Sequence, residues 1–245
     1  MARSEQAPVV YRALVALVRV FLHLLIRRRW RGLHHVPRNG GVLVVSNHTS
    51  NFDTITLADA VITTGRWPRF LGKSEIWKVP VIGWLARQCR QIPVERHTVR
   101  AKDSLRHAAD ALTAGDCVAI FPEGTITRDP EGWPMVARRG AARLALQTGA
   151  PVVPVAQEGC QAVLGGRRLQ LRKLFSWRRR PIDVAIGAPV ELDDLREREL
   201  TDEVVDAAAR RITEALTELY APLRGKAAPA LIWDPWQETY VSRTA

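Results

Sequence analysis

VLVVSNHTSNFD, at residues 42–53, is the stretch that decides how the chain folds. Its apolar half continues from two glycines as GGVLVV, residues 40–45, a β-branched run that predicts a buried strand. Small polar residues then replace the apolar ones, and any of residues 49–51 can cap a helix over residues 53–61. A strand, a short polar turn and a helix are therefore expected in immediate succession.

His48 and Asp53 lie at the two ends of this turn. On one continuous helix a spacing of five would point the two side chains apart, so they meet only if the turn folds back. A carboxylate that accepts the proton of one ring nitrogen leaves the other nitrogen free to take a proton, which makes the pair a base. Two ordinary explanations stand beside this one. An acid in a first helical turn is stabilised by the helix dipole, and a loop histidine often makes only a surface hydrogen bond.

The whole chain has 245 residues, enough for one α/β domain with a full core. Lys and Arg number 36 against 25 Asp and Glu, which gives a formal net charge of +11 and a pI of about 10.5. Such an excess favours an anionic partner: nucleic acid, a membrane surface or a phosphorylated substrate. Three scattered cysteines, Cys89, Cys117 and Cys160, form no disulfide framework or zinc spacing and fit a reducing, cytosolic setting.

The segment 1–31 is predicted to anchor the protein to a membrane surface. Residues 9–26 are mostly apolar but include Arg12 and Arg19, which argue against a spanning helix of about 20 mainly apolar residues. The basic cluster RRRWR, residues 27–31, follows, so we expect a helix in the membrane interface with its arginines on anionic head groups. An amphipathic helix packed on its own domain is the alternative. A secretory signal is disfavoured because no small-residue cleavage site follows.

Strands and helices alternate along the rest of the chain, which predicts an α/β fold with a mixed, largely parallel central sheet flanked by helices. We expect the main domain to cover residues 32–225 and a C-terminal surface tail to cover residues 226–245. Ligands belong at the carboxyl ends of the strands in such a sheet. Further strands are expected at 69–72, 91–94, 117–121, 151–156 and 182–186, and helices at 99–114, 137–148 and 193–220, the last with a break near 200–201.

Several polar residues directly follow these predicted strands. FPEGT, residues 121–125, comes after one of them, and His48, Lys73 and Arg96 each come after another. The glycine permits a tight turn whose backbone N–H groups can point at an anion. One base with its carboxylate partner and several cations are thus expected at one edge of the sheet, a combination suited to transferring a group to a hydroxyl beside a phosphate.

Two other segments are open to two interpretations each. IWKVPVIGWL, residues 76–85, suits an acyl-chain pocket or lipid contact, and suits an ordinary core equally well. The basic segment 167–180 has Phe175 and Trp177 among its arginines, so it either docks on anionic lipid or is a solvated loop.

Four blocks of the sequence resemble the glycerolipid acyltransferase family, which includes bacterial 1-acylglycerol-3-phosphate acyltransferases. The blocks occur in the family's order, and the first and third together carry most of the resemblance. They are His48 with Asp53 in the HX4D pattern, GKSEI at 72–76 with IPVER at 92–96, FPEGT at 121–125 and VPV at 153–155.

The resemblance implies an enzyme that moves a fatty acyl group from acyl-CoA or acyl carrier protein to the free hydroxyl of lysophosphatidic acid, giving phosphatidic acid. It implies that His48 removes the hydroxyl proton and that Asp53 fixes the tautomer, without a metal or a further cofactor. It also implies a peripheral or monotopic location on the cytoplasmic face of the cell membrane. The substrate-binding residues that it implies are Lys73, Arg96, Glu123, Gly124, Thr125 and Arg128.

One position departs from the family's pattern. The family commonly has an arginine directly after the threonine of the third block, where it binds the acceptor's phosphate; this chain has Ile126, and the nearest arginine is Arg128. Either Arg128 replaces it, or Arg96 and Lys73 bind the phosphate, or the acceptor differs. Glycerol 3-phosphate, another lysophospholipid and an amino-acid lipid are the alternative acceptors.

Other classes of protein have less support. Nucleic-acid binding depends only on the pI and on arginines interleaved with tryptophan, without a recognisable nucleic-acid-binding motif. A Ser-His-Asp hydrolase lacks a Gly-x-Ser-x-Gly elbow, and His34 and His35 belong to no spaced set of metal ligands. A non-catalytic protein that binds the membrane surface with the same fold remains an alternative to the enzyme.

Overall fold

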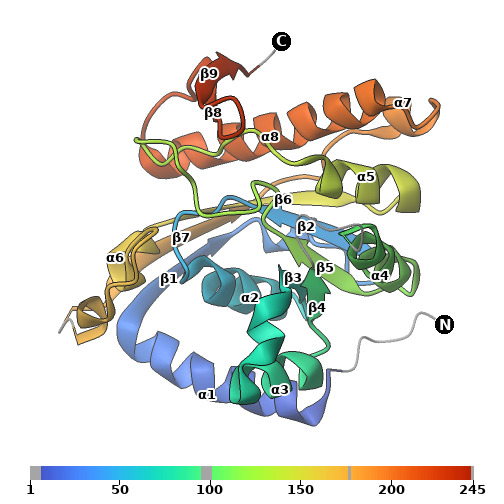
Figure 1. Cartoon of the computed structure of the whole chain (residues 1–245). Coiled ribbons are helices and arrows are strands. Elements are labelled where there is room, and N and C mark those ends of the chain that lie inside the picture. Colours follow the sequence, from blue (N-terminus) through green and yellow to red (C-terminus); the bar gives the residue numbers. More distant parts are fainter. Residues whose placement is uncertain (1–6, 95–100, 176–177, 244–245) are drawn as a thin grey trace.

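The computed structural model of the chain describes residues 7–94, 101–175 and 178–243. Its centre is a seven-stranded sheet between two layers of helices (Figure 1). The strands, in their order across the sheet, are β1 (Ile26–Arg31), β7 (Arg180–Ile186), β6 (Val152–Glu158), β2 (Val42–Ser46), β5 (Cys117–Ile120), β3 (Arg69–Lys73) and β4 (Ile92–Val94). The helices are α1 (Val9–Leu25), α2 (Asp53–Thr63), α3 (Pro80–Gln88), α4 (Ala101–Thr113), α5 (Arg139–Thr148), α6 (Gln161–Leu164), α7 (Asp193–Arg196) and α8 (Asp202–Arg224).

Five neighbouring strands, from β6 to β4, run in the same direction. The sheet reverses once, where β6 and β7 pair antiparallel, and β1 then pairs parallel to β7. The predicted mixed, largely parallel sheet flanked by helices is therefore confirmed. The carboxyl ends of five strands meet at one edge, as expected for the ligand-binding edge of such a sheet.

The central strand β2 is buried on both faces, which explains its nearly continuous apolar sequence. Val42 and Val44 pack with α2 and the C-terminal end of α1 on one face. Leu43 and Val45 pack on the other face with α4, α5, α7 and α8. Two cores thus hold the ends of β2 and β5 in fixed register, and the turns that follow these strands are positioned by both.

The predicted boundary at residue 31 is wrong, because residues 26–31 form the edge strand β1. The arginine cluster therefore belongs to the sheet, where exposed charged side chains suit an edge strand. Helix α1 also packs on its own domain, because its Arg19 pairs with the buried Asp59 of α2 at 2.7 Å. Arg28 of β1 pairs with the same carboxylate at 3.0 Å. The expectation that Arg19 binds lipid head groups is corrected accordingly.

The opposite side of α1 is unpartnered in the described structure and apolar. Leu17, Val20, Phe21 and Leu24 are each between 55% and 64% exposed. None of the helices in the described part of the chain has the length and hydropathy that crossing a bilayer requires. Attachment of α1 to a membrane interface stays a prediction, which the exposed apolar side chains support.

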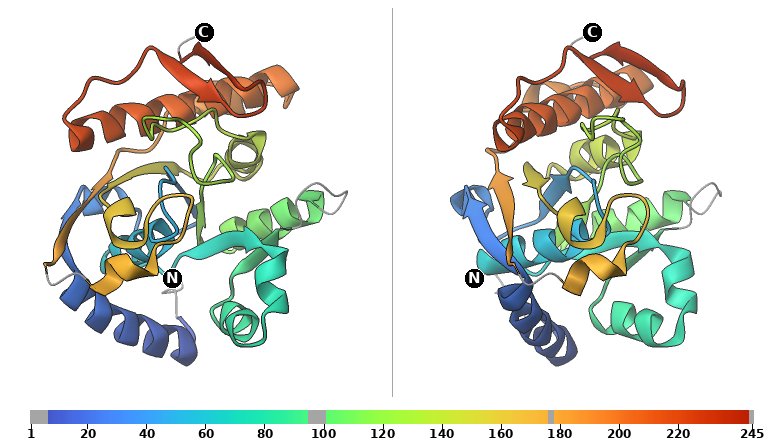
Figure 2. Two further views of the ribbon diagram at one scale, coloured as in Figure 1. Left: turned by 60° about the vertical axis from the view of Figure 1, so that its left-hand side comes forward. Right: turned by 90° about the vertical axis from the view of Figure 1, so that its left-hand side faces the viewer.

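The C-terminal tail forms a hairpin, β8 (Leu231–Asp234) with β9 (Thr239–Ser242), which lies over α8 (Figure 2). It is tied to the chain before α5 by a hydrogen bond from the Val136 N–H to the Trp233 carbonyl, 3.1 Å. The break predicted near residues 200–201 is present, because α7 and α8 are separate helices and Thr201 caps α8 through its side chain. Residues 76–85, interpreted from the sequence as an acyl-chain pocket or lipid contact or as an ordinary core, contribute to the 3-10 turn Ser74–Lys78 and to α3.

A buried arginine supports the entry into the sheet. Arg66, 2% exposed, donates to the carbonyls of Pro37, Gly40 and Gly115 at 2.7, 2.8 and 2.9 Å. Its guanidinium thus joins the loops that precede β2 and β5, which both lead into the polar turns described below.

Replacing Arg66 by Met should lower the free energy of unfolding by about 3 kcal/mol or more, because three buried carbonyls lose a charged donor. Chemical denaturation measures this difference. The matched variant Arg38→Met, at an exposed arginine of the loop that precedes β2, should change stability by no more than about 0.5 kcal/mol. Equal effects of the two substitutions would contradict the role of Arg66.

Candidate active site

His48 and Asp53 meet at the carboxyl end of β2. The His48 Nδ1 lies 3.0 Å from the Asp53 Oδ2, and the Asp53 side chain is fully buried while that of His48 is 15% exposed. With a carboxylate as acceptor, Nδ1 carries the proton and Nε2 is left as the proton acceptor. The geometry expected of a histidine base is therefore present.

The turn between them explains how a spacing of five brings the side chains together. Asp53 begins α2, and its Oδ2 also accepts the backbone N–H groups of Thr49 and Ser50, at 2.5 and 2.7 Å. Ser50 Oγ in turn donates to the Gly165 carbonyl at 2.5 Å. One carboxylate thus holds the turn before α2 and orients the imidazole. Asp53 also lies in the first turn of α2, where the helix dipole favours an acid, so the two interpretations of Asp53 made from the sequence apply together.

Glu123 links this turn to the one after β5. It is 1% exposed, and its two carboxyl oxygens accept the backbone N–H groups of His48, at 3.1 Å, and Met135, at 3.2 Å. Burial raises the pKa of Glu123 well above its usual range, although the two N–H donors act in the opposite direction. Glu123 therefore holds the backbone of His48 in place and does not face the substrate side.

The imidazole lies flat against the ring of Phe121, with ring centroids 4.1 Å apart and an angle of 16° between the planes. Both rings line a pocket of about 740 Å³ that extends between β3, β5 and α3. Its walls combine apolar groups, including Phe70, Ile76 and Trp77, with the cations Lys73, Arg138 and Arg167. Such a pocket suits a ligand with a long apolar part and an anionic head.

The predicted substrate-binding residues do not all line the pocket. Lys73, Gly124 and Thr125 line the pocket together with His48, whereas Glu123 lies behind the loop. Arg96 lies outside the described residues.

Arg128 is exposed and does not line the pocket, so the prediction that it replaces the family's arginine is not supported. The reason is the anchoring of Thr127, whose N–H donates to the His48 carbonyl at 2.7 Å and whose hydroxyl donates to the Trp133 carbonyl at 2.8 Å. Arg128 is exposed between two buried residues, Thr127 and Asp129. Ile126, in the family's arginine position, does line the pocket.

The sequence analysis did not identify Arg138 and Arg167 as residues of the pocket. Arg138 precedes α5, and its N–H donates to the Pro122 carbonyl at 2.8 Å. The sequence did contain a signal for Arg138. Two consecutive arginines at the start of a helix are disfavoured by the helix dipole, so each is expected to have a compensating interaction or a functional role. Arg139 has one, in ion pairs with Asp202 and Asp206, whereas Arg138 pairs with no carboxylate in the described part of the chain.

Metal chemistry gains no support from the described residues, among which no three His, Cys, Asp or Glu side chains are grouped closely enough to hold an ion. The site therefore offers a base, an apolar wall and cations.

Comparisons with known proteins bear on this site. The family model described as Acyltransferase matches residues 27–158, which is more than half of the chain and contains the His48–Asp53 turn and the Glu-Gly-Thr loop. The chain belongs to the acyltransferase family. The resemblance inferred from the sequence blocks is confirmed.

Individual relatives agree with this assignment. A chloroplastic 1-acyl-sn-glycerol-3-phosphate acyltransferase of Brassica napus is 33% identical over 136 residues, covering 55% of this chain and 38% of the relative. The enzyme of that name from Bacillus subtilis is 26% identical over 76% of this chain and 86% of the relative. The crystal structure of the 1-acyl-sn-glycerophosphate acyltransferase PlsC from Thermotoga maritima has the same fold, with a TM-score of 0.64 at 22% identity, over 89% of this chain and 81% of that one. The match spans less than two fifths of the Brassica relative's length.

The buried Glu123 gives this protein a pH-dependent contribution to stability. Because its pKa in the folded state is raised, its contribution is fully present below about pH 4.5 and is lost as the pH rises through the folded-state value. The unfolding free energy of the wild type should therefore fall relative to that of Glu123→Gln as the pH increases from 4.5, by at most about 1.4 kcal/mol per pH unit. Denaturant titrations at several pH values measure it.

The matched control for this prediction is Glu199→Gln, at an exposed position. The difference in unfolding free energy between Glu199→Gln and the wild type should not change with pH in this way. A wild-type stability that rises relative to Glu123→Gln with increasing pH would show that the two N–H donors outweigh burial.

Proposed function

We propose that this protein transfers an acyl group from a thioester donor to the free hydroxyl of lysophosphatidic acid, producing phosphatidic acid. The observation that carries the proposal is the His48–Asp53 pair at the wall of a pocket with both apolar and cationic groups, in a chain of the acyltransferase family. The names of the similar proteins also support lysophosphatidic acid as the acceptor.

In the proposed reaction His48 Nε2 takes the proton of the acceptor hydroxyl as its oxygen attacks the thioester carbonyl. The Asp53 carboxylate stabilises the imidazolium that forms. The tetrahedral intermediate then breaks its C–S bond, and the imidazolium returns the proton to the departing thiolate. Lys73 lines the same pocket and is the cationic candidate for stabilising the oxyanion.

Arg138 and Arg167 are the proposed partners of the acceptor's phosphate. Both line the pocket that contains His48, and Arg138 contacts Gly124, where an added Cβ would lie 2.8 Å from its Nε. They would supply from other elements the charge that Ile126 does not provide. Acyl-CoA or acyl carrier protein is the proposed donor, and the enzyme needs no further cofactor.

A membrane surface is the proposed location, on the cytoplasmic face of the cell membrane. Helices α1 and α3 lie side by side below the sheet (Figure 1), and α3 adds the exposed Val81, Ile82 and Trp84 to the apolar side of α1. The preceding turn supplies Ile76 and Trp77 to the pocket, so the pocket wall is continuous with this surface. A lipid acceptor would then enter the site from the bilayer.

Thiol release from oleoyl-CoA in the presence of lysophosphatidic acid tests the reaction. His48→Ala should lower kcat by about 10²–10⁴, because it removes the base, and should leave the melting temperature close to that of the wild type. The matched control His107→Ala, at an exposed histidine of α4, should retain full activity. Near-normal turnover of His48→Ala would refute the assignment, and a panel of the alternative acceptors in the same assay tests the acceptor.

Sedimentation with anionic liposomes tests the location. Phe21→Asp should weaken binding about tenfold or more, because it removes an aromatic side chain that would be buried in the bilayer interface. Added salt should weaken the binding of the wild type. The matched control Leu200→Asp changes a 43% exposed leucine on the other side of the sheet and should bind as the wild type does. Binding of Phe21→Asp equal to that of the wild type would exclude α1 as the part that contacts the liposome.

A further inference from the structure

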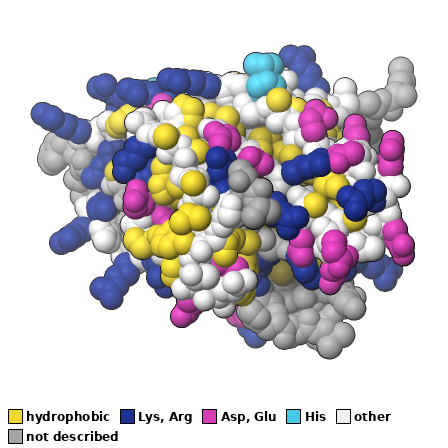
Figure 3. All heavy atoms as spheres, turned by 90° about the horizontal axis from the view of Figure 1, so that it is seen from above, with side chains coloured by type: hydrophobic (Ala, Val, Ile, Leu, Met, Phe, Trp, Pro, Cys, Tyr) yellow, Lys and Arg dark blue, Asp and Glu magenta, His cyan; other side chains and the backbone are white. Residues whose placement is uncertain are grey.

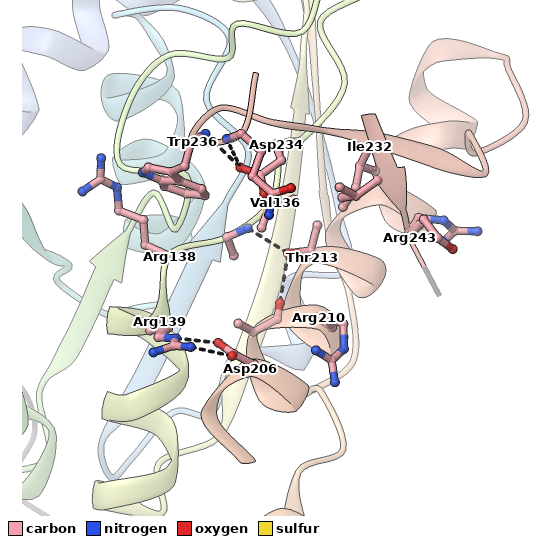
Figure 4. A pocket seen from close by; sticks show the side chains of 15 residues that line it. Val136, Arg138, Arg139, Asp206, Arg210, Thr213, Ile232, Asp234, Trp236 and Arg243 are labelled. Carbon is pink, nitrogen blue, oxygen red and sulfur yellow. Dashed lines mark hydrogen bonds and ion pairs between the residues drawn. The ribbon is translucent and has the colours of Figure 1, made fainter. Parts of the chain in front are cut away.

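A second cavity, of about 700 Å³, lies between the start of α5, helix α8 and the C-terminal hairpin (Figure 4). It is lined by four arginines, one tryptophan, Thr213 and several apolar side chains. The hairpin and α8 lie outside residues 27–158, so the family model covers only the wall of the cavity at the start of α5. The residues that matter here are Arg138, Arg139, Arg210, Arg243 and Trp236.

The arginines of the cavity divide into two that are paired and two that are available. Arg139 makes two hydrogen bonds of 2.6 Å to the carboxylate of Asp206, and Arg243 is paired with Glu218. Arg138 and Arg210 are exposed and pair with no carboxylate among the described residues. The cavity therefore has cationic groups free to bind an anion, on a wall fixed by the paired ones.

The tryptophan is held in place before any ligand binds. Asp234 Oδ1 accepts the backbone N–H groups of Trp236 and Gln237, at 2.8 and 3.2 Å, which fixes the hairpin turn. The Trp236 side chain is 49% exposed, and the Arg138 guanidinium carbon lies 5.2 Å from the indole centroid. Figure 4 shows this indole beside Arg138 at one end of the cavity. A half-exposed indole beside cations, on a backbone held by the turn, can stack a flat aromatic ring.

Arg138 joins this cavity to the active site. It is the one residue among those described that lines both cavities, and its N–H donates to Pro122 in the loop that holds His48. Gly124, with a φ of +71°, leaves room for the Arg138 side chain to cross that loop. A ligand that occupied both cavities would pass along Arg138.

We propose that this cavity binds the nucleotide half of acyl-CoA, an adenosine with three phosphate groups, while its thioester lies at His48. The inference depends on the proposed function. It matches the phosphates with Arg210, close to where Arg138 joins the two cavities, and the adenine with the indole of Trp236. It also assigns the donor to acyl-CoA and not to a carrier protein.

The position of the cavity favours a nucleotide over the other anionic partners. The hairpin and α8 lie on the side of the sheet opposite α1 (Figure 1), so a lipid surface bound at α1 does not reach them. Figure 3 looks onto this side and shows acidic side chains interspersed with the basic ones. An acidic carrier protein would meet those carboxylates, whereas a small nucleotide enters the cavity between them.

Calorimetry with 3′-phosphoadenosine 5′-diphosphate tests the binding without any need for catalysis. The wild type should bind this nucleotide, and Arg210→Ala and Trp236→Ala should each weaken binding about five- to tenfold, the loss of one charged or stacking contact. Trp236→Phe should weaken it less because a ring remains. The matched control Arg106→Ala, at an exposed arginine of α4, should bind as the wild type does. Absence of binding to the wild type overturns the inference.

Kinetics with a truncated donor separate this inference from the proposed function. The ratio of the KM for palmitoyl-CoA to the KM for palmitoyl-pantetheine, which lacks the nucleotide, should rise about five- to tenfold in Arg210→Ala and Trp236→Ala. An unchanged ratio, or a KM increase confined to acyl carrier protein, overturns the inference while leaving the acyltransferase intact. Absence of thiol release from every donor, with nucleotide binding preserved, would instead refute the proposed function.

Discussion

The buried carboxylate of Asp53 is the interaction on which the site depends. It accepts the ring N–H of His48 and two backbone N–H groups of the turn, so the start of α2, the shape of the turn and the tautomer of the imidazole are fixed by one group. A buried charge is costly unless its hydrogen bonds are satisfied, and here the donors surround it. Opening the turn would break hydrogen bonds to the buried carboxylate, so the turn has little conformational freedom.

The parallel sheet extends this constraint to the rest of the pocket. Because β2 and β5 are neighbours that point the same way, the loop after β5 lies against the turn after β2, and Glu123 and Thr127 bond directly to the His48 backbone. The conformation of the Glu-Gly-Thr loop is thus explained largely by its hydrogen bonds to the His48 backbone. Because Thr127 is held in this way, the neighbouring Arg128 is exposed and does not line the pocket, and the pocket's cations come from other elements.

The two sides of the sheet carry different surfaces. Apolar side chains of α1 and α3 gather on one side, and the arginine-lined cavity under the hairpin lies on the other, with the proposed active site between them. In the proposed enzyme this arrangement separates a membrane-bound acceptor from a water-soluble donor. The two substrates would then approach His48 from different directions, and Arg138 would contact the path of both.

From the sequence alone we predicted the strand–turn–helix around His48, the alternation of strands and helices, and the family, because these depend on local periodicity, capping and the order of short blocks. It did not reveal β1, whose arginines resemble a membrane anchor, or α3, whose apolar residues fit a core equally well. Only the tertiary structure decided that Arg19 pairs with Asp59, that Glu123 faces backbone, and that Arg138 enters the pocket. The physical reason is that an arginine or a carboxylate has the same local pattern whether it is solvated or paired, and its partner is chosen by elements that lie far away in the chain.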